Sequence, residues 1–285
     1  MWWVLPFELN DPGQVMPVIF STRTHNTLFT TSHKDQMATE RFIIREARDE
    51  EIPETIRVLS EGFTEDPVNN YMGGVKTKIQ ETNYSNYDFR ALTAFMQWQV
   101  FISRMHCDGR IVIALVEVDG KEKIIGGTIW NAPGKRVQFS LKELLPLYRS
   151  GTLTLLHYWG WSGIIRMVDY FPRAEAVFKE EWKQRKFTTS IDDTWQCWTA
   201  VVSSEYQGKG VLSRLFRAFF AYAPEWTMTL EATSEQSRDK YRHLGFETIG
   251  AVHYGKGSTD RMGLIASGED ATGFVVYPMV RWGPD

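Results

Sequence analysis

The chain has 285 residues, 43% of them hydrophobic, so it can bury a sizeable core in one or two domains. Its formal net charge of −3 provides no basic footprint for nucleic acid. Its two cysteines, Cys107 and Cys197, are too few for a disulfide framework or a cysteine-rich metal site, and they fit a reducing cytoplasm.

The first 40 residues show neither a helical nor a strand period, and they are rich in threonine and turn residues. We expect a poorly ordered N-terminal extension here. The apolar start has no basic flank, and Pro6, Glu8 and Asp11 interrupt it too early for a signal peptide. We therefore place the folded domain at residues 41–285.

A β-branched run at residues 41–47 predicts the first strand. Pro53 then opens a helix with apolar residues on one face, and we expect the Asp66-Pro67 pair to end it. Residues 87–104 have the spacing of a second helix.

A β-hairpin is predicted next. Residues 110–118 and 123–130 alternate as strands do, and Asp119-Gly120 between them is a strong two-residue turn signal.

Residues 135–190 are helix-like and form a predicted helical insertion. Their longest apolar stretch, residues 153–171, is interrupted by His157, Arg166 and Asp169. Its charge-free part is shorter than the roughly 18 residues of a spanning helix. We expect a buried or lid helix, with a helix lying on a membrane surface as the alternative.

The most informative segment is residues 205–216. An apolar strand, residues 198–202, leads into a loop that contains Gly208 and Gly210, and a helix with an apolar face follows. The unpaired N–H groups and positive dipole end of a helix start bind phosphate, and glycines let the backbone approach it closely. The spacing matches neither a P-loop nor a dinucleotide fold. The segment is therefore a pyrophosphate cradle or an ordinary turn.

A second signal follows about twenty residues later. Residues 227–233 are predicted as a strand, and residues 237–250 as a helix that ends at Gly245 before another strand. Residues 273–281 are the last predicted strand.

These two segments resemble the signatures of the GCN5-related N-acetyltransferase (GNAT) superfamily. The loop YQGKGV at residues 206–211 is similar to its acetyl-CoA loop, and Ser234 through Phe246, with Tyr241 before Gly-Phe, is similar to its second signature. Leu212, Ser234 and Ser237 depart from the usual residues. The W-x-x-PG, LEAT and PMVR motifs most resemble the fungal-type members.

The resemblance implies one α/β (α+β) domain of the GNAT fold, with a central twisted mixed sheet flanked by helices. It also implies acetyl-CoA as the donor, no metal, and direct transfer in a ternary complex. The strand before the loop would hold pantetheine, and the loop would hold the pyrophosphate. The implied acetyl-CoA ligands are Ala200, Val201, Val202, Gln207, Gly208, Lys209, Gly210, Val211, Leu212, Ser213 and Ser234.

Acetyl transfer to an amine needs a proton acceptor for the amine and a proton donor for the departing thiolate. Tyr241 occupies the position of the family's acid, although a core aromatic would fit the same pattern. Glu231 is the first candidate base. Glu205, Asp192 and Asp193 are further candidates, and a chain of water molecules could replace them.

The acceptor site should lie outside the two signatures. The resemblance places the segment 66–71 over it, and the insertion supplies an aromatic wall with few charges, which favours a small, partly apolar amine. The insertion residues concerned are His157, Tyr158, Trp159, Trp161 and Asp169. Acetylation of a protein amine, O-acetylation and a non-catalytic acyl-CoA-binding module are the alternatives. We expect no nucleic-acid or membrane partner, and the sequence leaves the oligomeric state open.

Overall fold

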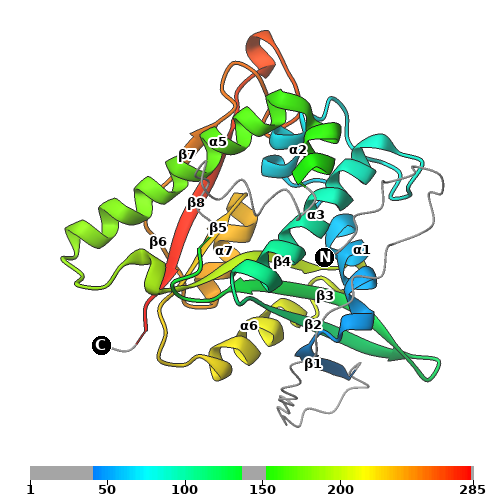
Figure 1. The fold of residues 1–285 in the computed structure, drawn as a ribbon, viewed down its shortest axis with the longest axis vertical. Coiled ribbons are helices and arrows are strands. Elements are labelled where there is room, and N and C mark those ends of the chain that lie inside the picture. Colours follow the sequence, from blue (N-terminus) through cyan, green and yellow to red (C-terminus); the bar gives the residue numbers. More distant parts are fainter. Residues whose placement is uncertain (1–40, 137–151, 284–285) are drawn as a thin grey trace, which may run out of the picture.

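The computed structural model describes residues 41–136 and 152–283, and a mixed β-sheet forms its centre (Figure 1). In the described residues the strands are β1 (Phe42–Glu46), β2 (Arg110–Val118), β3 (Lys121–Asn131), β4 (Trp195–Val202), β5 (Met228–Ala232), β6 (Glu247–Thr248), β7 (Val252–Tyr254) and β8 (Phe274–Arg281). Their order is β1-β2-β3-β4-β5-β8-β6, and β7 also pairs with β8. Only β4 and β5 pair in parallel; the other described pairs are antiparallel.

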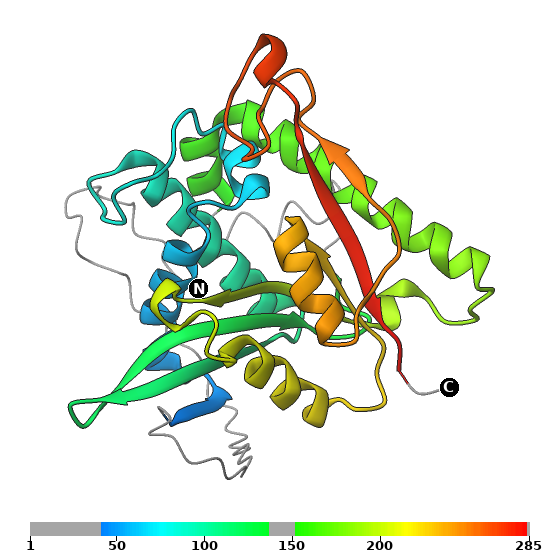
Figure 2. The ribbon, with the colours of Figure 1, turned by 180° about the vertical axis from the view of Figure 1, so that it is seen from behind.

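Helices cover both faces of this sheet. They are α1 (Ile52–Gly62), α2 (Pro67–Gly73), α3 (Tyr87–His106), α5 (Thr152–Gln184), α6 (Val211–Tyr222) and α7 (Glu235–His243). Helices α1 and α3 lie on one face, and α6 and α7 lie on the opposite one, as the two views show (Figures 1 and 2). The predicted fold class, a mixed sheet flanked by helices, is confirmed.

Each face has its own hydrophobic core. On the α1–α3 face, Leu59 and Phe95 pack with Ile113 of β2. On the α6 face, the Trp130 ring of β3 stacks on Phe219 of α6 with 3.9 Å between the ring centroids. The sheet therefore separates two packed layers, and a group that reaches from one layer to the other must pass between strands.

The predicted end of the first helix is wrong. Helix α1 ends at Gly62, and Asp66 instead begins α2 by accepting a hydrogen bond from the Asn69 backbone N–H at 2.9 Å. Aspartate before the first turn and proline at its first position are signals of a helix start. The Asp66-Pro67 pair does not end α1, because that helix already ends at Gly62.

The hairpin prediction is confirmed in detail. Strands β2 and β3 pair on either side of Asp119 and Gly120, which have φ values of 52° and 73°. Both residues lie in the left-handed region that a two-residue turn of this kind requires. The predicted second helix is also confirmed, and α3 continues two residues further, to His106.

Helix α5 is the described part of the predicted insertion, of which residues 137–151 lie outside the described residues. Its backbone breaks at Gly160 (φ 60°, ψ −171°), and it runs beside β7 and β8 and over α2 (Figure 1). One face is buried, through Leu155, Trp159, Tyr170 and others, whereas Trp161 is exposed. In the described part of the chain no helix is long and apolar enough to cross a membrane.

Candidate active site at the opening between β4 and β5

The parallel pair β4 and β5 opens partway along its length. The strands pair only from Trp195 to Cys197 on β4 and from Met228 to Leu230 on β5. Beyond Cys197, β4 continues to pair with β3 as far as Val202. Alternate backbone groups of residues 198–202 therefore face the opening without a strand partner. The Gln207 side chain donates to one of them, the Val202 carbonyl, at 3.1 Å.

A β-bulge explains the opening. Ile129 of β3 pairs with Thr199, but the next residue, Trp130, pairs with Cys197. Trp198 is thus an extra residue on β4. A bulge bends its strand and increases the local twist, which carries the second half of β4 away from β5.

The predicted pyrophosphate loop leads from β4 to α6. Gly208 and Gly210 have φ values of 76° and 79°, and a Cβ on either would meet no atom within 4 Å. Their positive φ favours glycine at both positions, and the space beside them is free for a ligand. A short 3₁₀ turn, Ser204–Tyr206, precedes them.

Helix α6 begins at Val211, and Gly210 provides no side-chain cap for it. The backbone N–H groups of the first turn, on Val211, Leu212 and Ser213, thus keep the unpaired donors and positive dipole of a helix start. The Leu212 side chain packs against the hydrophobic core on the α6 face. Such an N-terminus suits a phosphate group.

Two further predicted ligands have local partners. The Lys209 ammonium lies 4.8 Å from the ring centroid of Tyr206. Ser234 is exposed and caps α7, and its hydroxyl accepts from the Ser237 N–H at 3.1 Å. Its hydroxyl thus has a structural role, and the Ser234–Ser237 pair forms the capping box of α7.

Tyr241 extends from α7 toward the opening. Its ring packs on Phe216, with 5.4 Å between the ring centroids. Burial raises the pKa of the Tyr241 hydroxyl well above its usual value, and the nearby Cys197 thiol and Asp66 carboxyl raise it further. Because Cys197 is the last residue of β4 that pairs with β5, the hydroxyl lies close to where these two strands part, and it stays protonated at neutral pH.

A cleft lies on the other face of the sheet, between α2, α3, α5 and the opening. It is partly open to solvent. We call it the acid cleft, since its lining is apolar except for two carboxyl groups and a few neutral polar groups. The lining residues are Phe63, Asp66, Val68, Asn69, Met72, Phe95, Met96, Gln99, Tyr170, Phe171, Gln196, Cys197, Trp198, Thr199, Glu231 and Thr233.

The two carboxyl groups of this cleft are Glu231 on β5 and Asp66 at the start of α2. Glu231 accepts a hydrogen bond from the Tyr170 hydroxyl at 2.6 Å. Burial raises its pKa, while the Tyr170 hydrogen bond and the charge of Arg136 oppose the rise. Burial also raises the pKa of Asp66, against hydrogen bonds from the Thr233 hydroxyl and from backbone N–H groups.

Neither carboxyl group forms an ion pair within the described residues. Arg136 donates instead to the Thr194 and Thr229 hydroxyls. The cleft therefore holds two desolvated acids that a bound cation would stabilise.

Two side-chain amides that line the acid cleft, those of Gln99 and Asn69, have unused hydrogen-bonding groups. The Thr199 hydroxyl donates to Oε1 of Gln99 at 2.8 Å, but Nε2 of Gln99 has no hydrogen-bond partner among residues 41–136 and 152–283. The Asn69 side-chain amide likewise has none there, although the residue is only 8% exposed.

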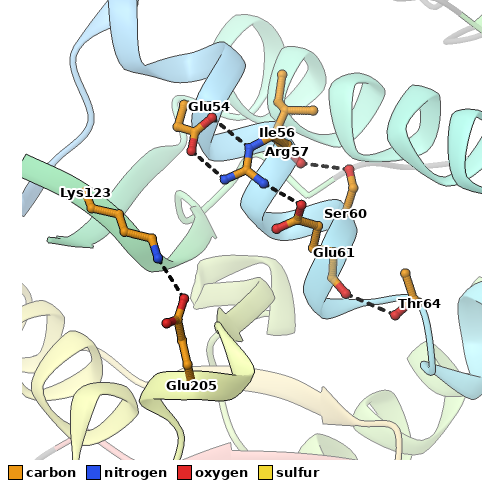
Figure 3. A network of polar contacts seen from close by, with 8 residues as sticks. All are labelled: Glu54, Ile56, Arg57, Ser60, Glu61, Thr64, Lys123 and Glu205. Carbon is orange, nitrogen blue, oxygen red and sulfur yellow. Dashed lines mark hydrogen bonds and ion pairs between the residues drawn. The ribbon is translucent and has the colours of Figure 1, made fainter. Parts of the chain in front are cut away.

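The other predicted bases lie elsewhere. Glu205 is at the surface and pairs with Lys123 at 2.7 Å; Figure 3 shows this pair beside the Arg57 network of α1. Asp193 caps the short 3₁₀ turn Ile191–Asp193 before β4, and Asp192 lies in the same turn. Neither lines the acid cleft, so the structure brings only Glu231 of the predicted bases to it.

None of the predicted aromatic-wall residues lines the acid cleft. His157 and Trp161 are exposed, and Asp169 pairs with Arg173 at the surface. Tyr158 and Trp159 line a second, shallow cleft between α2, α3 and α5, which we call the side cleft.

Two insertion residues of the acid cleft, Tyr170 and Phe171, were missed from the sequence. Leu155, Trp159, Met167 and Tyr170 share the buried face of α5. Following this helical phase from Leu155 leads to Tyr170. In the described part of the chain, no group of His, Cys, Asp or Glu is placed to hold a metal ion.

No family model matches the chain, and no curated protein matches it. The solved structures that it resembles include several described as acetyltransferases. One, a Corynebacterium glutamicum protein described as histone acetyltransferase HPA2 and related acetyltransferase, is 19% identical, with a TM-score of 0.49 over 85% of this chain and 96% of that one.

Arylalkylamine N-acetyltransferase 2 from Aedes aegypti is 14% identical, with a TM-score of 0.49 over 85% of this chain and 98% of that one. The Drosophila melanogaster polyamine N-acetyltransferase, which forms N-acetylagmatine, is 14% identical, with a TM-score of 0.45 over 84% of this chain and 99% of that one.

Proposed function

We propose that the protein is an acetyl-CoA-dependent N-acetyltransferase that moves an acetyl group directly to a small-molecule amine in a ternary complex. One observation supports this most strongly. The opening between β4 and β5 has the glycine loop and Tyr241 on one side and an acid-lined cleft on the other. A donor and an acceptor can thus meet at one point from opposite faces of the sheet.

The residues present fit acetyl-CoA as the donor substrate. The first turn of α6, beside Gly208 and Gly210, would bind the pyrophosphate. The free backbone groups of residues 200–202 would pair with the pantetheine amides as an added strand does. One backbone N–H at the bulge would polarise the thioester carbonyl.

Asp66 is the base that we propose. Its carboxyl is close enough to Tyr241 to affect the pKa of that hydroxyl, whereas Glu231 is occupied by Tyr170. Burial moves the pKa of Asp66 upward, toward the range in which a carboxylate accepts a proton effectively. Glu231, the base predicted from the sequence, would then bind the ammonium group of the acceptor. If Asp66 does not take the proton, Glu231 is the alternative base.

The proposed reaction balances with these two residues. The Asp66 carboxylate takes a proton from the bound ammonium, and the neutral amine forms the new C–N bond with the carbonyl carbon. The C–S bond breaks, and the Tyr241 hydroxyl donates its proton to the departing thiolate. Tyr241 suits this step because its raised pKa keeps the proton on the hydroxyl until a thiolate forms. The second proton of the attacking nitrogen then passes to the Tyr241 phenolate, which restores the hydroxyl and leaves a neutral amide, and Asp66 releases the first proton to solvent.

The acid cleft favours a small acceptor. Helices α2, α3 and α5 wall it on several sides, and its lining is mostly apolar with a few polar groups, as in other small-molecule sites. The similar proteins include arylalkylamine and polyamine N-acetyltransferases, so small amines are the first acceptors to test. The fungal-type subgroup and the cytoplasmic location stay predictions from the sequence.

The test is an assay of thiol release from acetyl-CoA over a panel of small amines, matching alcohols and lysine peptides. We expect release with small amines only. Release with alcohols or peptides alone would support O-acetylation or protein acetylation instead. Tight acetyl-CoA binding without release for any acceptor would identify a binding module.

A further inference from the structure

The side cleft lies next to the acid cleft and has no role in the proposed chemistry. Asn69 lines both clefts. On α3, Leu92 lines the side cleft, and Phe95 and Met96, one turn further on, line the acid cleft. The two clefts therefore follow one another along α3.

The boundary between the clefts consists of side chains. The Phe95 ring from the acid cleft packs on the Trp159 ring from the side cleft, with 4.7 Å between their centroids. Asn69 lies at the same boundary and is only 8% exposed, and its side-chain amide makes no hydrogen bond among the described residues. This amide is therefore available to a ligand or water in either cleft.

The side cleft has one ionisable carboxyl group, that of Asp88 in the first turn of α3. No lysine, arginine or histidine lines this cleft. Within the described residues the Asp88 carboxylate has neither an ion pair nor a hydrogen-bond partner. Tyr87 and Tyr158 beside it are joined by a hydrogen bond of 2.8 Å from the Tyr87 hydroxyl to the Tyr158 carbonyl.

We propose that the side cleft is the far subsite for the acceptor, and that it binds a second cationic group of a long amine at Asp88. The reacting amine would lie in the acid cleft, its apolar chain would pass Asn69 and the Phe95–Trp159 pair, and its far ammonium would reach Asp88. Asp88 and Gln99 are eleven residues apart on α3, which corresponds to about 16 Å along the helix. The acceptor is thus an extended α,ω-diamine.

This inference rests on the proposed function, and the experiment separates the two. Linear primary monoamines of increasing length and the α,ω-diamines of matching length are compared as acceptors. For the long members, we expect kcat/KM to be about tenfold higher for the diamine, which corresponds to about 1.4 kcal/mol of extra binding. Asp88→Asn should remove this preference and leave the short monoamines unchanged. Asp270→Asn, at an exposed aspartate that lines neither cleft, is the matched control.

A second variant tests the cleft without changing a charge. Ile79→Trp places a larger side chain at the rim of the side cleft, and it should lower kcat/KM for long acceptors of both kinds while sparing short ones. Calorimetric binding of the diamines to the protein with CoA, for wild type and Asp88→Asn, gives a readout that does not depend on turnover.

The outcomes are distinct. Equal kcat/KM and equal binding for long diamines and monoamines, or an equal loss for both in Asp88→Asn, would overturn the subsite while acetylation of short amines upholds the function. If no amine is acetylated, the proposed function fails. Diamine binding that depends on Asp88 would then still support the subsite, and its absence would overturn that as well.

Discussion

Replacing Gly210 with alanine separates ligand binding from backbone strain at the glycine loop. Gly210 has a φ of 79° and open space where a Cβ would stand. Alanine in this left-handed conformation costs about 1–2 kcal/mol of stability. Gly120, in the β2–β3 turn, has a φ of 73° and equally open space, so Gly120→Ala carries the same strain at a turn that contributes no residue to the proposed site.

Only the Gly210 variant should lose affinity for acetyl-CoA. The added Cβ would stand beside the first turn of α6, where a phosphate must approach the backbone donors. Loss of one hydrogen bond to a charged group costs about 1.5–3 kcal/mol, or roughly ten- to hundredfold in Kd. Calorimetry with CoA measures the affinity, and thermal unfolding measures the strain. Unchanged affinity in Gly210→Ala, or an equal loss in Gly120→Ala, would refute the loop as the pyrophosphate site.

Three further variants test the chemistry. Tyr241→Phe should lower kcat by about 10²- to 10⁴-fold, and calorimetry should show an unchanged affinity for acetyl-CoA, because only the proton donor is lost; a kcat within twofold of wild type would argue against this role. Asp66→Asn keeps a helix cap and should lower kcat/KM by a similar factor. Burial raises the pKa of Asp66, so its charged form destabilises the fold as pH rises through that pKa. Asp66→Asn should therefore match wild type in thermal stability at acid pH and exceed it at neutral pH, whereas a variant less stable at neutral pH would contradict this electrostatic account. The pH profile of wild-type kcat/KM should fall on the acid side at a pKa above that of an ordinary aspartate, and an unshifted pKa would remove Asp66 as the base. Tyr170→Phe removes the hydroxyl that donates to Glu231, so it should cost about 1–3 kcal/mol of stability in denaturant unfolding, and no loss would show that Glu231 finds another partner.

Much of the fold could be predicted because it is encoded locally. Alternation and the Asp119-Gly120 turn define the β2–β3 hairpin, and helical spacing defines α3. The Asp66-Pro67 pair was assigned to the wrong boundary. An Asp-Pro pair is found both after the end of one helix and at the start of the next. The two cases differ only in where α1 ends, and it ends at Gly62, before the pair.

The site was less accessible from the sequence than the fold. The glycine loop is local, so its residues could be named in order. The opening beside it depends on a bulge at Trp198, which is a difference in register between β3 and β4 and leaves no motif. The pairing of Tyr170 with Glu231 joins residues 61 positions apart, and it depends on how α5 crosses the sheet edge.

The electrostatics of the opening bring the two halves of the site together. Burial raises the pKa of Tyr241, Asp66 and Glu231 alike, but the consequence differs between them. The tyrosine is held as a proton donor, while each carboxyl group becomes a stronger proton acceptor whose charged form lacks an ion-pair partner in the described residues. A bound ammonium supplies that missing charge, and it returns to a neutral amine when one carboxylate takes its proton. The acid cleft therefore binds its acceptor most strongly as a cation, whereas attack on the thioester requires the neutral amine. The carboxylate that removes the proton converts the one form into the other, at the point where β4 and β5 part.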